Sequence, residues 1–302
     1  MARTRELINR TAGSHRLLCH AVFTPGTPGW MDQIEYAIEK LKPDSWKGYT
    51  VGDPLAPSQF AWRLDDEKLV YPFYEKIEKV GIKTVCIHKG LLPADYETSF
   101  KDVWKYANVD DVPKAAKDWP NLNFVIYHSA LRPFLELPDA DATQFEKSGQ
   151  IPWASDLAAI PKRLGVTNVY AEIGTAFASA AVTNPRLAAG LLGSLIKGMG
   201  VDHVIWGTDS VWYGSPQWQI EAPRRLEIPD DLQKKFGYAP LGPADGPVKN
   251  AILGLNGAKF YDLKPTARYG RIERDAIDKM KQDYRVSGIG QSNAAYGYVL
   301  PS

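Results

Sequence analysis

The sequence predicts an α/β protein in which a parallel sheet is covered by helices. Short runs rich in Val, Ile and aromatic residues alternate along the chain with longer stretches of helical periodicity. The composition, with 44% hydrophobic and 24% charged residues, is that of a globular protein with a large core. The length of 302 residues suits either one α/β barrel with extensions or two domains.

Six short runs are predicted as strands. Each is apolar, contains β-branched or aromatic residues, and is followed by a turn or a helical stretch. Strands that alternate with helices in this way pair in parallel. The six predicted strands are residues 16–23, 45–51, 83–88, 123–128, 168–173 and 203–207.

Helices are predicted from apolar spacing and from the residues at their ends. Ile34 and Ile38 follow helical periodicity, and Gly81 is a typical helix end. Asn184 before Pro185 is a favourable helix start. The predicted helices are residues 31–41, 69–80, 113–119, 153–164, 185–199, 230–236, 246–263 and 272–285.

Long irregular connections are expected at residues 53–66, 89–113, 130–151 and 210–247. The last three follow predicted strands, so they are placed to form a wall over any site at the strand ends. The 9 Trp, 15 Tyr and 22 Pro residues indicate that such connections are ordered and aromatic-lined.

Charge and cysteine content exclude several classes of protein. With 36 basic and 35 acidic residues, the chain lacks the basic excess of a nucleic-acid or anionic-membrane partner. Cys19 and Cys86 lie in apolar runs, where they predict reduced core thiols rather than disulfides or a Cys zinc site. No apolar run is long enough for a signal peptide or a membrane span, so a cytoplasmic location is expected, a processed export signal aside.

Side chains that can bind metal ions or transfer protons lie within the predicted strands or at their carboxyl ends. Catalytic groups of parallel sheets gather at the carboxyl ends of the strands. Imidazole and carboxylate together are ligands for Zn²⁺ and similar ions. Glu172 fits a buried hydrogen-bonding carboxylate as well as a functional one. The residues in these positions are His20, Lys47, His88, His128, Glu172 and Asp209.

His88, His128 and Asp209 are predicted to be functional because they end neighbouring βα units. His20 is followed by more apolar strand and is predicted to be a satisfied core or loop-facing histidine. Lys47 fits an ion pair with a carboxylate, a carbamylated metal-bridging lysine or a clamp for a substrate anion.

The last predicted strand and the helix after it carry a resemblance to a known family. The strings HVIWGTDS and ILGLNGAKFYDL resemble the end of the amidohydrolase-related (amidohydrolase 2) proteins, which include the aminocarboxymuconate-semialdehyde decarboxylase-like enzymes. The strands that end in His88 and His128 are similar to the family's fifth and sixth, so the resemblance covers residues 16–263.

The resemblance implies a metal-dependent (β/α)8 TIM barrel. It makes His88 the metal ligand of strand five and Asp209 the strand-eight aspartate that touches the metal and handles the proton of bound water. It makes His128 the strand-six histidine that polarises the substrate, shuttles a proton or binds the metal. Lys47 falls on strand four, where some amidohydrolases place a carbamylated lysine.

One family feature is missing from this sequence. No His-x-His motif occurs, although the family's first strand carries one. Counting back from Asp209 gives strands eight to three, so the first two βα units are expected to be absent. We expect residues 1–263 to form the barrel and 264–302 a helical or irregular extension. The open sheet edges would then be covered by a homo-oligomer or by a missing N-terminal segment.

The function expected from these residues is metal-dependent hydrolysis of an amide, ester or lactone. A divalent ion, Zn²⁺ in the first place with Mn²⁺ or Fe²⁺ as alternatives, lowers the pKa of bound water toward ~7. Asp209 would take the proton, and His128 would stabilise the oxyanion. The predicted ligands are Lys47, His88, His128 and Asp209.

A small, ring-bearing or apolar substrate is expected from the residues near the strand ends. Arg132, Trp212 and Glu172 are predicted to contact it, and Arg132 suits a substrate carboxylate. Trp104, Tyr213, Trp218, Arg224 and Arg225 are further candidates.

Two alternatives to the hydrolase stay open. One is a metal-dependent, non-oxidative decarboxylase of an aromatic or enoic acid, which uses the same aspartate to protonate a carbanionic centre. The other is a barrel remnant without catalytic activity.

Overall fold

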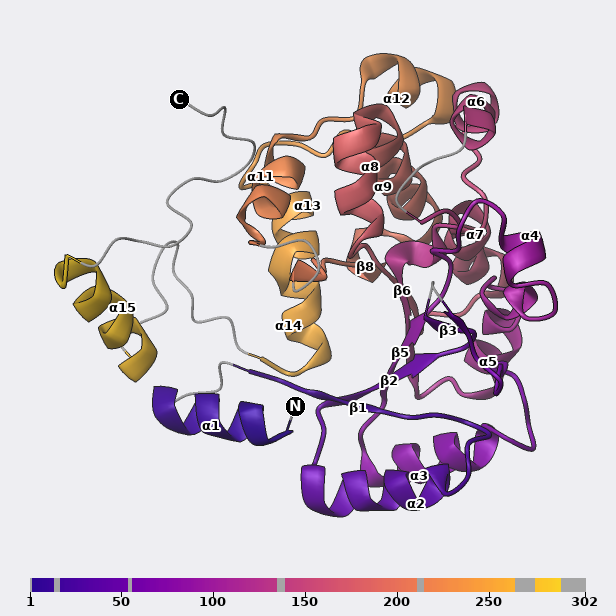
Figure 1. Cartoon of the computed structure of the whole chain (residues 1–302). Helices are drawn as coiled ribbons and strands as arrows, with labels where there is room; N and C mark the ends of the chain where they lie inside the picture. The colour runs from indigo at the N-terminus through magenta and orange to yellow at the C-terminus, as the bar shows by residue number, and fades with distance from the viewer. Residues whose placement is uncertain are drawn as a thin grey trace.

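The structure is a computed structural model that describes residues 2–13, 17–53, 56–134, 139–210, 215–263 and 275–288. Six strands form one sheet in which every neighbouring pair is parallel, in the order β1-β2-β5-β6-β7-β8 (Figure 1). This is the α/β, TIM-barrel-type fold that the sequence predicts, with six strands. The strands are β1 (His20–Val22), β2 (Ser45–Tyr49), β5 (Thr84–His88), β6 (Asn123–Tyr127), β7 (Val169–Glu172) and β8 (Val204–Ile205).

One face of the sheet is apolar and packs against helices. Trp46 packs edge-on against Phe73 of α3, and Phe124 contacts the ring of Tyr74. These side chains belong to one continuous core together with Ile87. The covering helices are α2 (Trp30–Tyr36), α3 (Tyr71–Val80), α5 (Val112–Asp118), α7 (Ala154–Leu164), α8 (Ala176–Thr183) and α9 (Pro185–Met199).

The opposite face of the sheet is polar and is partly covered by the last helical segment of the barrel region. In Figure 1, α13 (Pro247–Asn250) and α14 (Asn256–Phe260) lie on the other side of the sheet from α5 and α7. The ring of Phe260 lies 4.4 Å from that of Tyr170 in β7. The hydroxyl of Tyr261 lies 3.2 Å from Ser45 Oγ in β2. The segment therefore crosses from the β8 edge toward β2.

The end signals of the predicted helices are present in the structure. Gly81 and Gly165 end their helices with φ of 82° and 67°, in the left-handed region that glycine adopts without strain. The Asn184 side chain accepts a hydrogen bond from the backbone N–H of Leu187, 3.1 Å away, at the start of α9. Helices α12 (Asp230–Phe236) and α15 (Ala276–Val286) also lie where helices are predicted.

All four predicted loops contain regular structure, and these predictions are wrong; residues 89–113 include α4 (Tyr96–Ser99). Residues 130–151 include α6 (Asp139–Ser148), and residues 210–247 include α11 (Gln217–Arg225). Residues 53–66 overlap a short hairpin of β3 (Gly52–Asp53) and β4 (Ala56–Pro57). Helices α6 and α11 bury few residues, so their apolar periodicity is too weak to be recognised from sequence.

The first and last strands are shorter than predicted. The first keeps only three residues and the last only two, because each lies at an edge and pairs on one side. Beside β8, the backbone N–H of Trp206 donates to the Ile252 carbonyl, 3.1 Å away, in place of a further strand. The remaining elements are α1 (Ala2–Ala12), α4 (Tyr96–Ser99), the π-helical turns 37–41 and 251–255 and the 3₁₀ turns 104–106, 128–130 and 201–203. None of the described helices is both long and apolar enough to cross a membrane.

Candidate active site

Four of the predicted site residues lie together at the carboxyl ends of the strands. His88 is the last residue of β5, and His128 directly follows β6. Glu172 is the last residue of β7, and Asp209 lies in the connection after β8. Parallel strands bring their carboxyl ends to one edge of the sheet, which is why residues so distant in sequence meet.

The two histidines form a directed hydrogen-bond chain. His128 Nδ1 lies 2.8 Å from the carbonyl oxygen of Gly174, and His128 Nε2 lies 3.0 Å from His88 Nδ1. A carbonyl only accepts, so His128 carries its proton on Nδ1, and its Nε2 accepts from His88 Nδ1–H. The hydrogen-bond network therefore assigns an unprotonated Nε2 to His88. This atom is buried and has no hydrogen-bond partner among the described residues.

Burial keeps both imidazoles neutral. It lowers the pKa of His128 to about 4, and the charge of Lys47 acts in the same direction. The pKa of His88 is also well below its usual value, mainly through burial and then through His128. At neutral pH His88 is therefore a neutral imidazole whose buried Nε2 carries a lone pair.

Glu172 supports the backbone of this site. Its Oε2 accepts from the His128 N–H at 3.1 Å, and its Oε1 accepts from the Gly174 N–H at 2.7 Å. A Cβ on Gly207 would lie 1.7 Å from Oε1, so only glycine leaves room for the carboxyl group. Burial raises the pKa of Glu172 to about 7. The carboxyl thus holds both the backbone of His128 and the residue whose carbonyl orients its ring.

Asp209 faces the histidine chain from the connection after β8. It accepts a hydrogen bond from the Thr175 hydroxyl, and its Oδ2 lies 3.5 Å from His128 Nδ1. Asp209, Thr175 and His128 have positive φ values of 46°, 55° and 61°. Non-glycine residues rarely adopt this conformation, and such strain concentrates at functional sites.

Lys47 lies on the same polar face, at the middle of β2. Its ammonium is 3.3 Å from the centroid of the Tyr127 ring and 5.1 Å from that of Tyr49. Burial lowers the pKa of Lys47 to about 8, although the charges of Glu172 and Asp209 oppose this. Among the described residues it forms a cation–π contact rather than an ion pair with a carboxylate within 4.0 Å.

His20 has partners on both ring nitrogens, as predicted for a satisfied histidine. Nδ1 lies 2.6 Å from Ser45 Oγ, and Nε2 lies 3.2 Å from the Tyr127 hydroxyl. Burial, followed by the charge of Lys47, lowers its pKa to about 4. His20 therefore fixes Tyr127, whose ring contacts Lys47.

Of the predicted substrate contacts, Glu172 belongs to the cluster above, whereas several others are paired with other residues or lie outside the described residues. Arg132 forms an ion pair with Asp141, and its guanidinium lies 5.2 Å from the centroid of the Tyr96 ring. Trp104 is parallel to Trp153 at 6.3 Å and packs in a small apolar cluster. Trp212 and Tyr213 lie outside the described residues. Arg224 pairs with Asp245 and Arg225 with Glu221.

Sequence reasoning missed three contributors to the site: Tyr127, Thr175 and Gly174. Tyr127 could have been found, because it lies on the polar face of β6 beside the predicted His128. Thr175 and Gly174 give no local signal, because they act through a hydroxyl and a carbonyl that only the folded chain brings to the site.

The arrangement of these side chains offers fewer metal ligands than the sequence predicts. In the part of the chain that the structure describes, no group of three or more His, Cys, Asp or Glu side chains is placed to hold a metal ion. Both nitrogens of His128 are already hydrogen-bonded, which leaves His88 Nε2 and the Asp209 carboxylate as donors. These residues do not by themselves fit a complete metal centre, and the four-ligand set stays a prediction.

The parallel sheet and the polar cluster at its strand ends are those of an enzyme of the TIM-barrel type. A sequence model of the amidohydrolase family matches residues 40–263. The chain therefore belongs to the amidohydrolase family. No curated protein matches the chain.

Several solved structures resemble this fold. An uncharacterised TIM-barrel protein from Bordetella bronchiseptica is similar over 86% of this chain and 72% of its own, with 16% identity and a TM-score of 0.50. A 2,6-dihydroxybenzoate decarboxylase in complex with 2,6-dihydroxybenzoate is similar over 87% and 75%, with 12% identity and a TM-score of 0.50. A dihydroxybenzoic acid decarboxylase from Polaromonas with bound manganese is similar over 86% and 74%, with 12% identity and a TM-score of 0.46. At these identities the likeness concerns the fold.

Proposed function

We propose that the protein is a decarboxylase of an aromatic carboxylic acid that bears a hydroxyl group beside the carboxylate. The observation that carries this proposal is the buried, unprotonated Nε2 of His88, joined through His128 to Asp209 and close to a buried lysine. The resemblance in fold to a 2,6-dihydroxybenzoate decarboxylase supports this substrate class. The hydrolase expected from the sequence has less support.

The proposed steps use three groups of the chain. The Lys47 ammonium attracts the substrate carboxylate, and the flanking rings of Tyr49 and Tyr127 suit an aromatic ring. His88 Nε2 accepts the proton of the neighbouring hydroxyl, which pushes electron density into the ring. Asp209, once its carboxylate has taken a proton from solvent, gives this proton to the ring carbon that bears the substrate carboxylate.

The bond between this carbon and the carboxylate then breaks, and CO₂ leaves. The electron pair of that bond restores the aromatic phenolate, which takes its proton back from His88. Asp209 regains a proton from solvent, so the net reaction consumes one proton and releases one CO₂.

Whether the reaction needs a divalent metal ion is left to the assay with chelator-treated protein described below. When bound, such an ion supplies positive charge that polarises a carboxylate or an oxygen. Structures of this fold contain manganese or zinc, but the metal of this chain, whether Zn²⁺, Mn²⁺ or Fe²⁺, stays a prediction. Because two donors do not complete a centre, no step above passes through a metal.

The test measures CO₂ release and phenol formation from 2,6-dihydroxybenzoate and salicylate, with chelator-treated protein and with added Mn²⁺ or Zn²⁺. We expect CO₂ release that Asp209→Asn abolishes and that Lys79→Gln, a change at an exposed lysine of α3, leaves unaltered. Hydrolysis of an ester or lactone without CO₂ from any acid would overturn the proposal in favour of the hydrolase. Absence of both reactions would favour the remnant without catalytic activity.

A further inference from the structure

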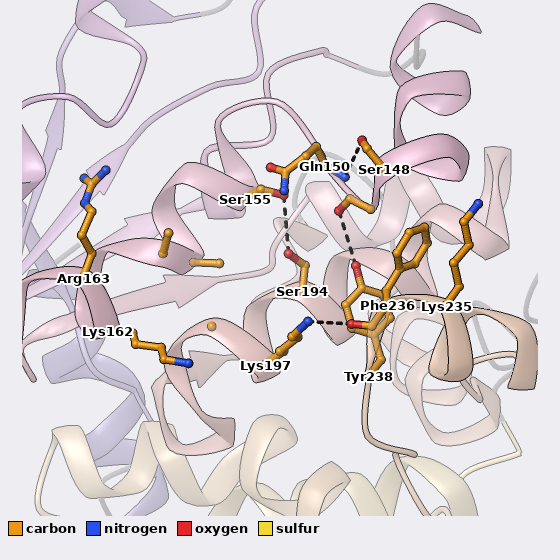
Figure 2. A pocket seen from close by; sticks show the side chains of 14 residues that line it. Ser148, Gln150, Ser155, Lys162, Arg163, Ser194, Lys197, Lys235, Phe236 and Tyr238 are labelled. Carbon is orange, nitrogen blue, oxygen red and sulfur yellow. Dashed lines mark hydrogen bonds between the residues drawn. The ribbon is translucent and has the colours of Figure 1, made fainter.

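A groove on the outer side of the helix layer has features of a second binding site. It has a volume of about 610 Å³ and is lined by residues from the end of α6, from α7 and α9, and from the segment around the end of α12 (Figure 2). Helices α7 and α9 cover the apolar face of the sheet, whereas the candidate active site uses the polar face. The groove is therefore distinct from the site described above.

The charged residues that line the groove are all positive: Lys162, Arg163, Lys197 and Lys235. Lys162 and Arg163 have no ion-pair or hydrogen-bond partner among the described residues. Arg186, at the start of α9, is by contrast paired with two carboxylates, those of Glu146 and Asp231. Unpaired like charges around one concavity raise its positive potential and favour an anion there.

The ammonium groups of Lys197 and Lys235 are held in place by hydrogen bonds to backbone carbonyls. Lys197 Nζ donates to the Phe236 carbonyl at 2.6 Å, and Lys235 Nζ donates to the Glu146 carbonyl at 2.5 Å. An ammonium has three hydrogens, so each lysine keeps two for a ligand. Fixed ammonium groups lose less conformational freedom on binding than free ones.

The floor of the groove offers neutral hydrogen-bonding groups and an aromatic surface. Ser155 Oγ and Ser194 Oγ lie 3.5 Å apart between α7 and α9. The buried Tyr238 hydroxyl donates to the Gly149 carbonyl at 3.4 Å, and the ring of Phe236 lines the same side. Figure 2 shows the serines and the aromatic rings between the Lys162–Arg163 side and the Lys235 side.

We propose that this groove binds a small organic polyanion, either a phosphate ester or a polycarboxylate. Cations on two sides of a floor that offers hydroxyl groups and an aromatic ring suit an organic ligand with two separated negative groups. The volume lies within the range of about 300–1,000 Å³ for small-molecule sites and exceeds what a single phosphate needs. This inference does not depend on the proposed decarboxylase activity.

The test is calorimetric titration of the whole protein with inorganic pyrophosphate and, separately, with citrate at constant ionic strength. We expect saturable binding of at least one anion, weakened about tenfold or more by the double substitution K162Q/R163Q, which removes two charge-assisted contacts. Saturation by pyrophosphate alone assigns a phosphate ester, and saturation by citrate alone assigns a polycarboxylate.

The matched control is K79Q/K83Q, which removes two exposed charges near the end of α3. This control should bind as the parent does. An equal loss in both double variants would show only general charge attraction and overturn the proposal, as would the absence of saturable binding by either anion. Binding should persist in Asp209→Asn, so the result stands apart from the decarboxylase assay.

Discussion

The two faces of the central sheet differ in nearly every property, although their residues alternate along the same strands. The helix-covered face presents Trp46, Ile87 and Phe124, which are fully buried in one apolar core. The opposite face presents Lys47 and His88, which are buried but polar. Successive side chains of a strand point to opposite faces, so one short run supplies both surfaces.

The comparison shows how the molecule separates stability from chemistry. On the apolar face, burial is favourable and needs no partners. On the polar face, burial shifts pKa values, lowering those of His20, His128 and Lys47 and raising that of Glu172. Each polar group there needs a specific partner, and among the residues that the structure describes His88 Nε2 has none.

The largest expected effect on stability comes from the apolar face. Phe124→Ala removes a fully buried ring that contacts Tyr74, and should lower the free energy of unfolding by about 3–5 kcal/mol. Urea denaturation followed by fluorescence measures this. Val22→Ala, at a 57% exposed edge position, is the control and should change the stability by less than about 0.5 kcal/mol. Similar losses in both variants would contradict the division between the faces.

The largest expected effect on activity comes from the polar face. His88→Gln removes the imidazole base and should lower the decarboxylation rate by about 10²–10⁴-fold. Its free energy of unfolding should fall less than that of Phe124→Ala, because no ring-sized cavity forms. The decarboxylation rate and the free energy of unfolding, both measured on the same preparation of the variant, test this prediction. Unchanged activity in a folded His88→Gln protein would remove this residue from the proposed mechanism.

Glu172→Gln should have an intermediate effect. One carboxylate oxygen is replaced by an NH₂ group that faces a backbone N–H, of His128 or Gly174, which should cost about 1–3 kcal/mol. The raised pKa of Glu172 stabilises the fold at low pH, and this contribution is lost as pH rises through about 7. The variant should lose that pH dependence. The ordinary pKa of a glutamate is 4.5. If the free energy of unfolding of the variant depends on pH between 4.5 and about 7 as that of the parent does, Glu172 is not the group responsible.

The smallest expected effect is on acid stability through His20. Its pKa is lowered from 6.5 to about 4, so the unfolded chain binds the proton more readily than the folded protein. Stability should therefore fall as pH decreases from 6.5 toward 4. The unfolding temperature of the His20→Gln variant should decrease less steeply than that of the parent as the pH is lowered over this range.

Local sequence predicted much of the fold. The alternation of apolar runs and helical stretches placed six strands, and Asn184 and Gly165 marked helix ends that the structure contains. The weakly apolar helices α6 and α11 escaped prediction, because each is held by a few tertiary contacts rather than by a continuous apolar stripe.

The sequence by itself determined which residues stand at the strand ends, because strand periodicity and helix boundaries are local properties. His88, His128 and Asp209 could be singled out in this way. Only the tertiary structure decided what each can do. The Gly174 carbonyl fixes the tautomers of two histidines, and an aromatic ring rather than a carboxylate faces Lys47. These outcomes depend on contacts between distant strands, and burial gives such contacts their strength because little water remains to compete.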